Sequence, residues 1–169
     1  MRKVLFLDRD GVINKDVHYL HRIEDLAFVD GAKEVLAAAV QAGYDLIVVT
    51  NQSGVGRGFY TEDDVNTLHQ YMNQELTKAG APILRFYYCP HLPGAPLAQY
   101  DQNCDCRKPK PGMLLQAMAD YDIDKAHSFM VGDKLSDMEA AAGAGLKGYL
   151  FTGSNLAEFL QPILQEQTN

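Results

Sequence analysis

The chain has 169 residues, of which 47% are hydrophobic and 22% are charged, as in an ordinary globular protein. This composition argues against a disordered chain, a collagen-like chain and a repeat array. With 15 Lys and Arg against 22 Asp and Glu, the formal charge is −7, which argues against a nucleic-acid partner. We therefore expect one globular domain over residues 1–169.

The N-terminal apolar run, residues 4–7, is interrupted at once by Asp8, Arg9 and Asp10. It is too short for the core of a signal peptide. No segment approaches the roughly 20 apolar residues that span a bilayer. We therefore expect a cytoplasmic protein with no membrane partner, and we expect it to be a monomer.

Short apolar runs alternate with helical patterns along the chain. Five runs predict strands, at residues 4–7, 46–49, 83–88, 128–131 and 148–151. The first two are apolar throughout, as is typical of strands covered on both faces. This alternation predicts an α/β fold, a doubly wound, Rossmann-like, mainly parallel sheet with helices on both faces.

The helices between these strands have recognisable ends. Asp30 is expected to cap a helix through Ala42, and Thr61 with Asp64 resembles a capping box for a helix that ends near Gly80. We place His69 on the polar side of that helix and expect it to be solvated. Further helices are predicted from Pro111, over residues 137–144, and over residues 155–165, where Pro162 predicts a short or kinked helix.

Ligands of parallel sheets bind at the carboxyl ends of the strands, and the first strand is followed by Asp8, Asp10 and Gly11. Two carboxylates at this spacing can face one cavity, one as nucleophile and metal ligand and the other as acid and base. Gly11 allows the backbone to turn sharply directly after Asp10. A solvated turn is an equally good interpretation of this segment alone.

The ends of the second and third strands carry groups that suit phosphate oxygens. Thr50, Asn51, Gln52 and Ser53 offer neutral donors, although a polar turn explains them as well. After the third strand, Arg107 and Lys108 stand just before a helix and can offset phosphate charge, although such a cluster is usually a solvated charge run.

The fourth strand is followed by Asp133 and, four residues later, Asp137. Both carboxylates can approach a hard cation such as Mg²⁺. The alternative is helix capping, which Asp133 or Ser136 would perform well.

Taken together, the four strand ends resemble the haloacid dehalogenase superfamily of phosphotransferases, over nearly the whole chain. The resemblance implies that Asp8 attacks phosphorus and that Asp10 protonates the leaving alcohol and then takes a proton from water. It implies Mg²⁺ held by Asp8, the Asp10 backbone carbonyl and Asp133, with Thr50 and Lys108 on the phosphoryl oxygens.

All three cysteines lie in one segment, in which Cys89 and His91 are followed, after residues 92–103, by Cys104 and Cys106. Four such ligands suit tetrahedral Zn²⁺ in a closed structural site. The alternative is three reduced cysteines and a surface histidine. We expect a zinc-binding loop over residues 89–106, which we call the Cys/His loop. Because residues 11–49 are too few for a cap domain, this loop is expected to cover part of the site.

This combination narrows the resemblance to the zinc-containing branch of the superfamily and to its heptose 1,7-bisphosphate phosphatase family. It implies removal of the C7 phosphate of a phosphorylated sugar used for lipopolysaccharide or other glycans. Carried over by position, the residues that would contact the sugar phosphate, Arg107 foremost, are Asp16, Val17, His18, Tyr19, Asn51, Gln52, Ser53, Arg107 and Lys134.

Other functions remain open at this point. Histidinol-phosphate phosphatases share the catalytic motifs and the Cys/His loop. A phospho-receiver signalling domain also combines an acidic cluster, Mg²⁺, Thr and Lys, but the candidate acid and base Asp10 favours turnover. An inactive scaffold is disfavoured because every catalytic position holds a competent residue.

Overall fold

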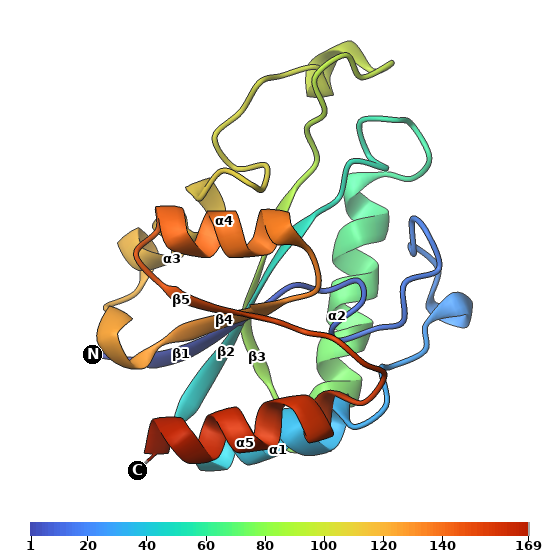
Figure 1. Cartoon of the computed structure of the whole chain (residues 1–169). Helices are drawn as coiled ribbons and strands as arrows, with labels where there is room; N and C mark the ends of the chain where they lie inside the picture. The colour runs from blue at the N-terminus through green and yellow to red at the C-terminus, as the bar shows by residue number, and fades with distance from the viewer. Residues whose placement is uncertain (169) are drawn as a thin grey trace.

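The computed structural model describes residues 1–168 and contains a five-stranded, entirely parallel sheet (Figure 1). The order of the strands across the sheet is β3-β2-β1-β4-β5. Their bounds are β1 Lys3–Leu7, β2 Tyr44–Asn51, β3 Ile83–Cys89, β4 Phe129–Gly132 and β5 Lys147–Leu150. The predicted Rossmann-like fold is therefore confirmed.

Both faces of the sheet are buried because alternate residues of each central strand enter different cores. In β1, Leu5 and Leu7 face one core, whereas Val4 and Phe6 face the other. Five helices supply the rest of the packing, α1 Ala32–Gln41, α2 Glu62–Lys78, α3 Gly112–Asp120, α4 Leu135–Gly143 and α5 Leu156–Thr168. Helices α1, α2 and α5 contribute to the first core, and α3 and α4 contribute to the second (Figure 1).

Several predicted helix details were wrong. Helix α1 begins after Gly31, which has a positive φ of 78°, while the exposed side chain of Asp30 lies toward Lys15 and makes no cap. Helix α4 begins at Leu135, not at residue 137. Helix α5, predicted over residues 155–165, runs from Leu156 to Thr168 and includes Pro162, and its apolar face is buried in the first core.

His69 was predicted to be solvated and is instead buried, with 4% of its surface exposed. It stands in the middle of α2, where it follows Leu68 on the side that faces β3. The helical pattern alone could not place it, because its partners come from β3 and from the loop after β1.

Two long connections rise at the carboxyl ends of the strands. Residues 8–31, with the short 3₁₀ helix Ile23–Asp25, lie beside α2 (Figure 1). The segment from Pro90 to Pro111, with the 3₁₀ helix Ala98–Tyr100, stands above the sheet. A third 3₁₀ helix, Lys125–His127, precedes β4. Within residues 1–168, no helix combines the length and the apolarity needed to cross a membrane.

Candidate active site

The predicted catalytic side chains meet at one edge of the sheet. Asp8 directly follows β1, Thr50 lies at the end of β2 and Asp133 directly follows β4. Lys108 reaches the same place from the segment after the Cys/His loop, and Asp137 from the first turn of α4. The parallel order of the strands explains this convergence, because their carboxyl ends share one edge.

Lys108 is the centre of this buried group. Its Nζ donates hydrogen bonds to Asp8 Oδ1 at 2.9 Å, to Asp137 Oδ1 at 2.6 Å and to the Val49 carbonyl at 3.0 Å. Burial opposes its charge, but the two carboxylates outweigh burial and raise the pKa of Lys108. Lys108 is therefore a fixed cation beside the candidate nucleophile.

The carboxylates around Lys108 leave room for a divalent cation. Oxygens of Asp8, Asp133 and Asp137 lie within 4.8 Å of one another. Asp133 Oδ1 is buried and has no hydrogen-bond partner among the residues the structure describes. Burial, with repulsion by Asp137 and Asp10, raises the pKa of Asp8 to about 7 despite Lys108. Carboxylate oxygens are ligands that fit Mg²⁺.

Gly11 is required where the chain passes this group. It has a φ of 86°, and a Cβ at this position would overlap with Asp133 Oδ2. The glycine therefore permits both the turn after Asp10 and the close approach of Asp133.

Asn51 uses its whole side-chain amide to hold the backbone of Lys108. Its Oδ1 accepts from the Lys108 N–H at 3.0 Å, and its Nδ2 donates to the Lys108 carbonyl at 3.2 Å. Asn51 was predicted as a substrate contact, and it also lines the pocket described below. The contacts it makes here are with Lys108.

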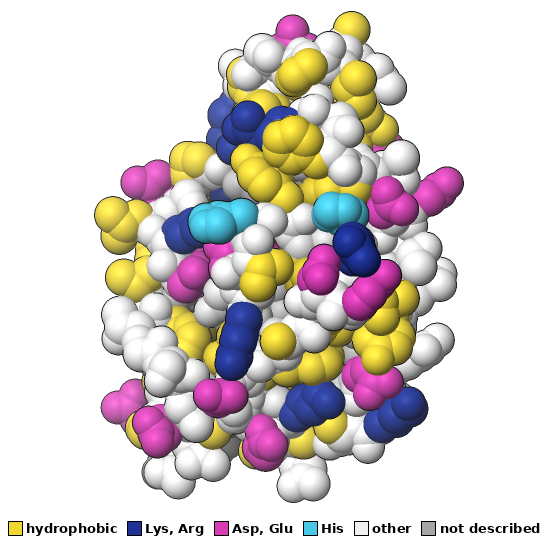
Figure 2. All heavy atoms as spheres, turned by 90° about the vertical axis from the view of Figure 1, so that its right-hand side faces the viewer, with side chains coloured by type: hydrophobic (Ala, Val, Ile, Leu, Met, Phe, Trp, Pro, Cys, Tyr) yellow, Lys and Arg dark blue, Asp and Glu magenta, His cyan; other side chains and the backbone are white. Residues whose placement is uncertain are grey.

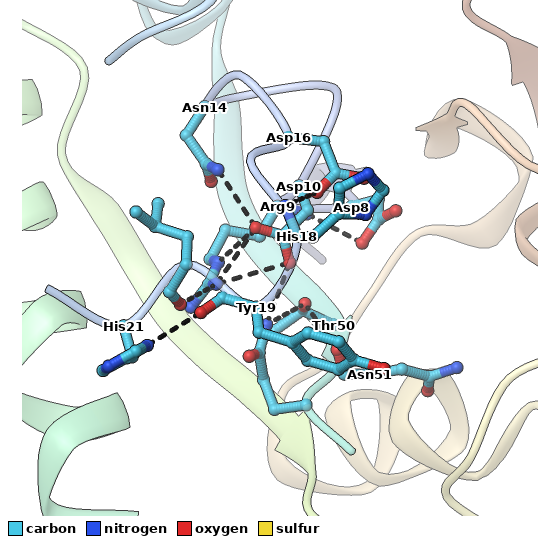
Figure 3. Close-up of polar contacts among 12 residues, drawn as sticks. Asp8, Arg9, Asp10, Asn14, Asp16, His18, Tyr19, His21, Thr50 and Asn51 are labelled. Atoms are coloured by element: carbon cyan, nitrogen blue, oxygen red, sulfur yellow. Dashed lines mark hydrogen bonds and ion pairs between the residues drawn. The ribbon is translucent and has the colours of Figure 1, made fainter. Parts of the chain in front are cut away.

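Asp10 is surrounded by donors (Figure 3). Its Oδ1 accepts from Arg9 Nη2 and from Asn14 Nδ2, each at 3.0 Å, and its Oδ2 accepts from Gln52 Nε2 at 3.1 Å. Burial opposes ionisation, but the Arg9 guanidinium and these hydrogen bonds together lower the pKa of Asp10. In this state Asp10 is a carboxylate, ready to accept a proton.

Gln52 and Thr50 form a second layer beneath the pocket. Gln52 Nε2 also donates to Thr50 Oγ1 at 2.9 Å, and its Oε1 accepts from the Tyr60 hydroxyl at 2.6 Å. Both Thr50 and Gln52 are almost fully buried. These contacts place Gln52, predicted as a substrate contact, between Thr50 and Asp10.

The segment from Asp16 to His21 forms one wall of the site. His18 and Tyr19 have positive φ values of 57° and 59°, which are uncommon for residues other than glycine. The His18 N–H donates to Asp16 Oδ1 at 3.0 Å, and His21 Nδ1 donates to the Tyr19 carbonyl at 2.8 Å (Figure 3). Two consecutive left-handed residues held in this way are typical of a functional loop.

A cavity of about 420 Å³ opens above these groups. Its lining includes most of the predicted substrate contacts, Asp16, His18, Tyr19, Asn51, Gln52, Ser53, Arg107 and Lys134. A smaller hollow of about 40 Å³ shares Asp10, Lys108 and Lys134 with it and reaches Asp8. Val17, in contrast, is about half exposed and does not line either cavity, and it is the one predicted contact that the structure leaves outside them.

Several residues around the site had no signal in the sequence. Ser136 and Tyr60 line the larger cavity, and Arg9 and His69 lie buried beneath it. Arginine and histidine are seldom fully buried, so a sequence pattern does not predict their place in a core. Only the packing of α2 against the loop after β1 brings them together.

The Cys/His loop gathers its four predicted ligands. The Sγ atoms of Cys89, Cys104 and Cys106 and Nδ1 of His91 lie within 4.8 Å of one another. The Cys106–Cys89 sulfur distance of 2.7 Å is too long for a disulfide. The contact with the Cys89 sulfur is the main cause that lowers the pKa of Cys106 to about 5. This donor set fits a closed tetrahedral Zn²⁺ site.

Arg107 links the Cys/His loop to the cavity. Its Nη1 lies 3.5 Å from the His91 carbonyl, and its side chain lines the cavity mouth. In the space-filling view, one group of basic side chains lies at the upper left of the molecule, and other basic and acidic side chains are spread over the rest of this face (Figure 2). An anionic ligand is therefore compatible with this side despite the net charge of −7.

The sequence of this chain is similar to one family model and to curated proteins that share one name. A family model described as HAD-hydrolase-like matches residues 105–163. The D-glycero-beta-D-manno-heptose-1,7-bisphosphate 7-phosphatase of Pasteurella multocida is 46% identical, over 94% of this chain and 86% of that protein. The protein of the same name from Salmonella typhi is 47% identical, over 98% of this chain and 85% of that protein.

Two solved structures are also similar to this chain. The D,D-heptose 1,7-bisphosphate phosphatase from B. bronchiseptica, complexed with magnesium and phosphate, has a TM-score of 0.83 and 32% identity, covering 97% of this chain and 99% of that one. A HAD-like phosphatase from Mesorhizobium loti has a TM-score of 0.88 and 29% identity, covering 99% of this chain and 86% of that one.

Proposed function

Because the chain belongs to the heptose 1,7-bisphosphate 7-phosphatase family of the haloacid dehalogenase superfamily, and is thus a phosphoric monoester hydrolase, we propose that it removes the C7 phosphate of D-glycero-D-manno-heptose 1,7-bisphosphate. The observation that supports this function best is the buried group of Asp8, Lys108 and Asp137 at the base of a polar cavity. A second basic group, Arg107, stands at the mouth of that cavity. Two basic groups in one cavity suit a substrate that carries two phosphates.

The mechanism we propose has two steps on one phosphorus. The Asp8 carboxylate attacks phosphorus, the bond from phosphorus to the ester oxygen breaks, and Asp10 gives its proton to that oxygen. Water then attacks the aspartyl-phosphate, Asp10 takes the proton of the water, and the bond from phosphorus to Asp8 breaks. The arriving phosphate dianion raises the otherwise low pKa of Asp10 and so makes the acid form available.

Thr50 and Lys108 would hold the phosphoryl oxygens during both steps. Asp8, the Asp10 carbonyl and Asp133 would hold Mg²⁺, as the unpartnered Asp133 Oδ1 and the close approach of the carboxylates favour. When bound, Mg²⁺ orients the phosphate and offsets its repulsion by the carboxylates. Asn51 keeps Lys108 in place through its two backbone hydrogen bonds.

A substrate panel tests the function. Phosphate release is measured with Mg²⁺ for both anomers of heptose 1,7-bisphosphate, for histidinol phosphate and for p-nitrophenyl phosphate. We expect the highest kcat/KM for a heptose bisphosphate, and the beta anomer first, because the relatives carry that name. A higher kcat/KM for histidinol phosphate would show that the substrate is wrong while the mechanism still holds. If no substrate is turned over, the chain is instead a phospho-receiver domain or an inactive scaffold.

Arg107 is expected to recognise the phosphate that does not react. Replacing Arg107 with Met should lower kcat/KM for the bisphosphate about 10- to 100-fold, since a charge-assisted hydrogen bond contributes roughly 1.5–3 kcal/mol. The same change should lower kcat/KM much less for heptose 7-phosphate, which lacks the second phosphate. Equal losses for the two sugars would show that Arg107 acts elsewhere.

Cys104 is expected to bind zinc together with Cys89, His91 and Cys106. Replacing Cys104 with Ser should lower the zinc content, measured by elemental analysis, and lower the melting temperature, because structural zinc contributes on the order of 10 kcal/mol to ordering. The wild-type protein stripped with a chelator and reloaded with zinc is the control. Full zinc occupancy in the variant would remove Cys104 from the ligand set.

A further inference from the structure

Two buried chains of hydrogen bonds end on the carboxylate of Asp10. One runs from His69 of α2 through the guanidinium of Arg9 to Asp10 Oδ1. The other runs from Tyr60, just before α2, through the amide of Gln52 to Asp10 Oδ2. Arg9 Nη2 also lies 3.3 Å from Asp10 Oδ2, so the two chains together hold both oxygens of this carboxylate.

The first chain has one possible direction. A guanidinium has only donors, so Arg9 Nη1 donates to His69 Nε2 at 3.1 Å, and the imidazole accepts as the neutral ring. The ring is fixed by stacking on Phe86 of β3, with the centroids 4.3 Å apart. Arg9 has no exposed surface and also donates to the Leu20 carbonyl at 2.9 Å. His69 thus holds Arg9 in the orientation that serves Asp10.

The second chain holds the Gln52 amide at both ends, because Asp10 accepts from its nitrogen and Tyr60 donates to its oxygen. The Tyr60 hydroxyl donates to Gln52 Oε1 at 2.6 Å, so Gln52 Nε2 is the atom that meets Asp10 and Thr50. Gly54 makes room for this contact, because a Cβ there would overlap with the Tyr60 ring. Without the hydroxyl, Gln52 Oε1 loses this hydrogen bond, and the Gln52 side chain is held less tightly against Asp10 Oδ2.

We propose that His69 and Tyr60 are positioning residues for Asp10, which aim its carboxyl group at the leaving oxygen of the substrate. His69 and Tyr60 also hold the wall of the cavity in place. His69 acts through Arg9, which donates to the Leu20 carbonyl, and the Tyr60 ring stacks on His21 with the centroids 4.9 Å apart. This inference rests on the proposed role of Asp10 as the acid.

The dependence of the rate on the leaving group tests the proposal. A sugar alkoxide must be protonated as it leaves, whereas p-nitrophenolate leaves without a proton. Tyr60→Phe, which removes a single oxygen atom, should lower kcat/KM for heptose 1,7-bisphosphate about tenfold, in line with the cost of a small misplacement. For p-nitrophenyl phosphate the loss should stay under about twofold, because the acid has little to do there.

Variants of His69 extend the test. His69→Leu removes the acceptor for Arg9 and should show the same selective loss of kcat/KM for the heptose substrate. His69→Gln retains an acceptor oxygen and should keep most of the wild-type kcat/KM. Tyr71→Phe, the same exchange on α2 at a partly buried tyrosine, is the matched control and should leave both substrates unchanged. Melting temperatures separate variants that fold poorly from variants that are folded and misaligned.

The failure of this inference can be told from the failure of the mechanism. Asp10→Asn is measured with the same two substrates and should show the strongest selective loss. If Asp10→Asn discriminates between the substrates but folded Tyr60→Phe and His69→Leu lower both equally, the positioning role is wrong. If Asp10→Asn itself lowers both equally, Asp10 is not the acid and the inference falls with that assignment.

Discussion

Replacing Asp8 with Asn is expected to reduce phosphate release to the background rate while the fold remains intact. The amide is a poor nucleophile and cannot form the proposed acyl phosphate. Its oxygen can still accept the hydrogen bonds that Asp8 Oδ1 accepts from Lys108 Nζ and the Arg9 N–H, at 2.9 and 2.8 Å. The loss should therefore be chemical and not structural.

Single-turnover assays with radiolabelled substrate measure this expectation, together with the melting temperature. In the wild-type protein, acid quenching should trap label on the chain, and in Asp8→Asn no label should be trapped. Asp63→Asn, the same exchange at an exposed site in the first turn of α2, is the matched control and should keep full activity. Turnover by Asp8→Asn at a rate near that of the wild type would exclude Asp8 as the nucleophile.

Replacing Lys108 with Met is expected to cost both stability and activity. Without the ammonium, Asp8 and Asp137 would face each other as buried carboxylates with no cation between them. Breaking a buried ion pair by removing one partner typically costs about 3–5 kcal/mol. Phosphate release should also fall by about 10²-fold or more, because a fixed cation beside the developing charge is lost.

A second substitution separates the loss of stability from the loss of activity. Lys108→Met combined with Asp137→Leu removes one of the two carboxylates that Lys108 contacts and should recover a large part of the free energy of unfolding in urea. Activity should remain low in the double variant, since the cation is still absent. Recovery of activity along with stability would show that Lys108 serves only the fold.

The motifs at the strand ends were recognisable because their residue types are uncommon together. Asp8, Thr50 and Asp133 each follow an apolar run, and a parallel sheet brings the ends of such runs to one edge, which Lys108 reaches from the segment after the Cys/His loop. The interior of the site was less predictable. Asn51 and Gln52 were expected at the substrate and line the cavity, and their amides also contact Lys108, Asp10 and Thr50. The sequence shows that an amide side chain is present, but it does not show whether that amide binds a ligand or another residue of the chain.

The helix ends also differ in how well the local sequence predicts them. The capping box of Thr61 and Asp64 was predicted and is present, because its hydrogen bonds join neighbours in the chain. The expected cap at Asp30 is absent, since the chain enters α1 through the left-handed Gly31 and the Asp30 side chain lies outside the turn. Helix α5 was expected over residues 155–165, and it extends through Pro162 to Thr168 with its apolar face on the first core.

The sequence by itself determined the strand and helix order, the parallel sheet, the family and the identity of the groups that could do chemistry, because these follow from local patterns of apolar and reactive residues. Only the tertiary structure decided how those groups are oriented. Arg9 and His69 are distant in the sequence, and the contact between them exists because α2 packs between the loop after β1 and the ring of Phe86 on β3. Long-range packing sets such contacts, and no spacing within either segment predicts them.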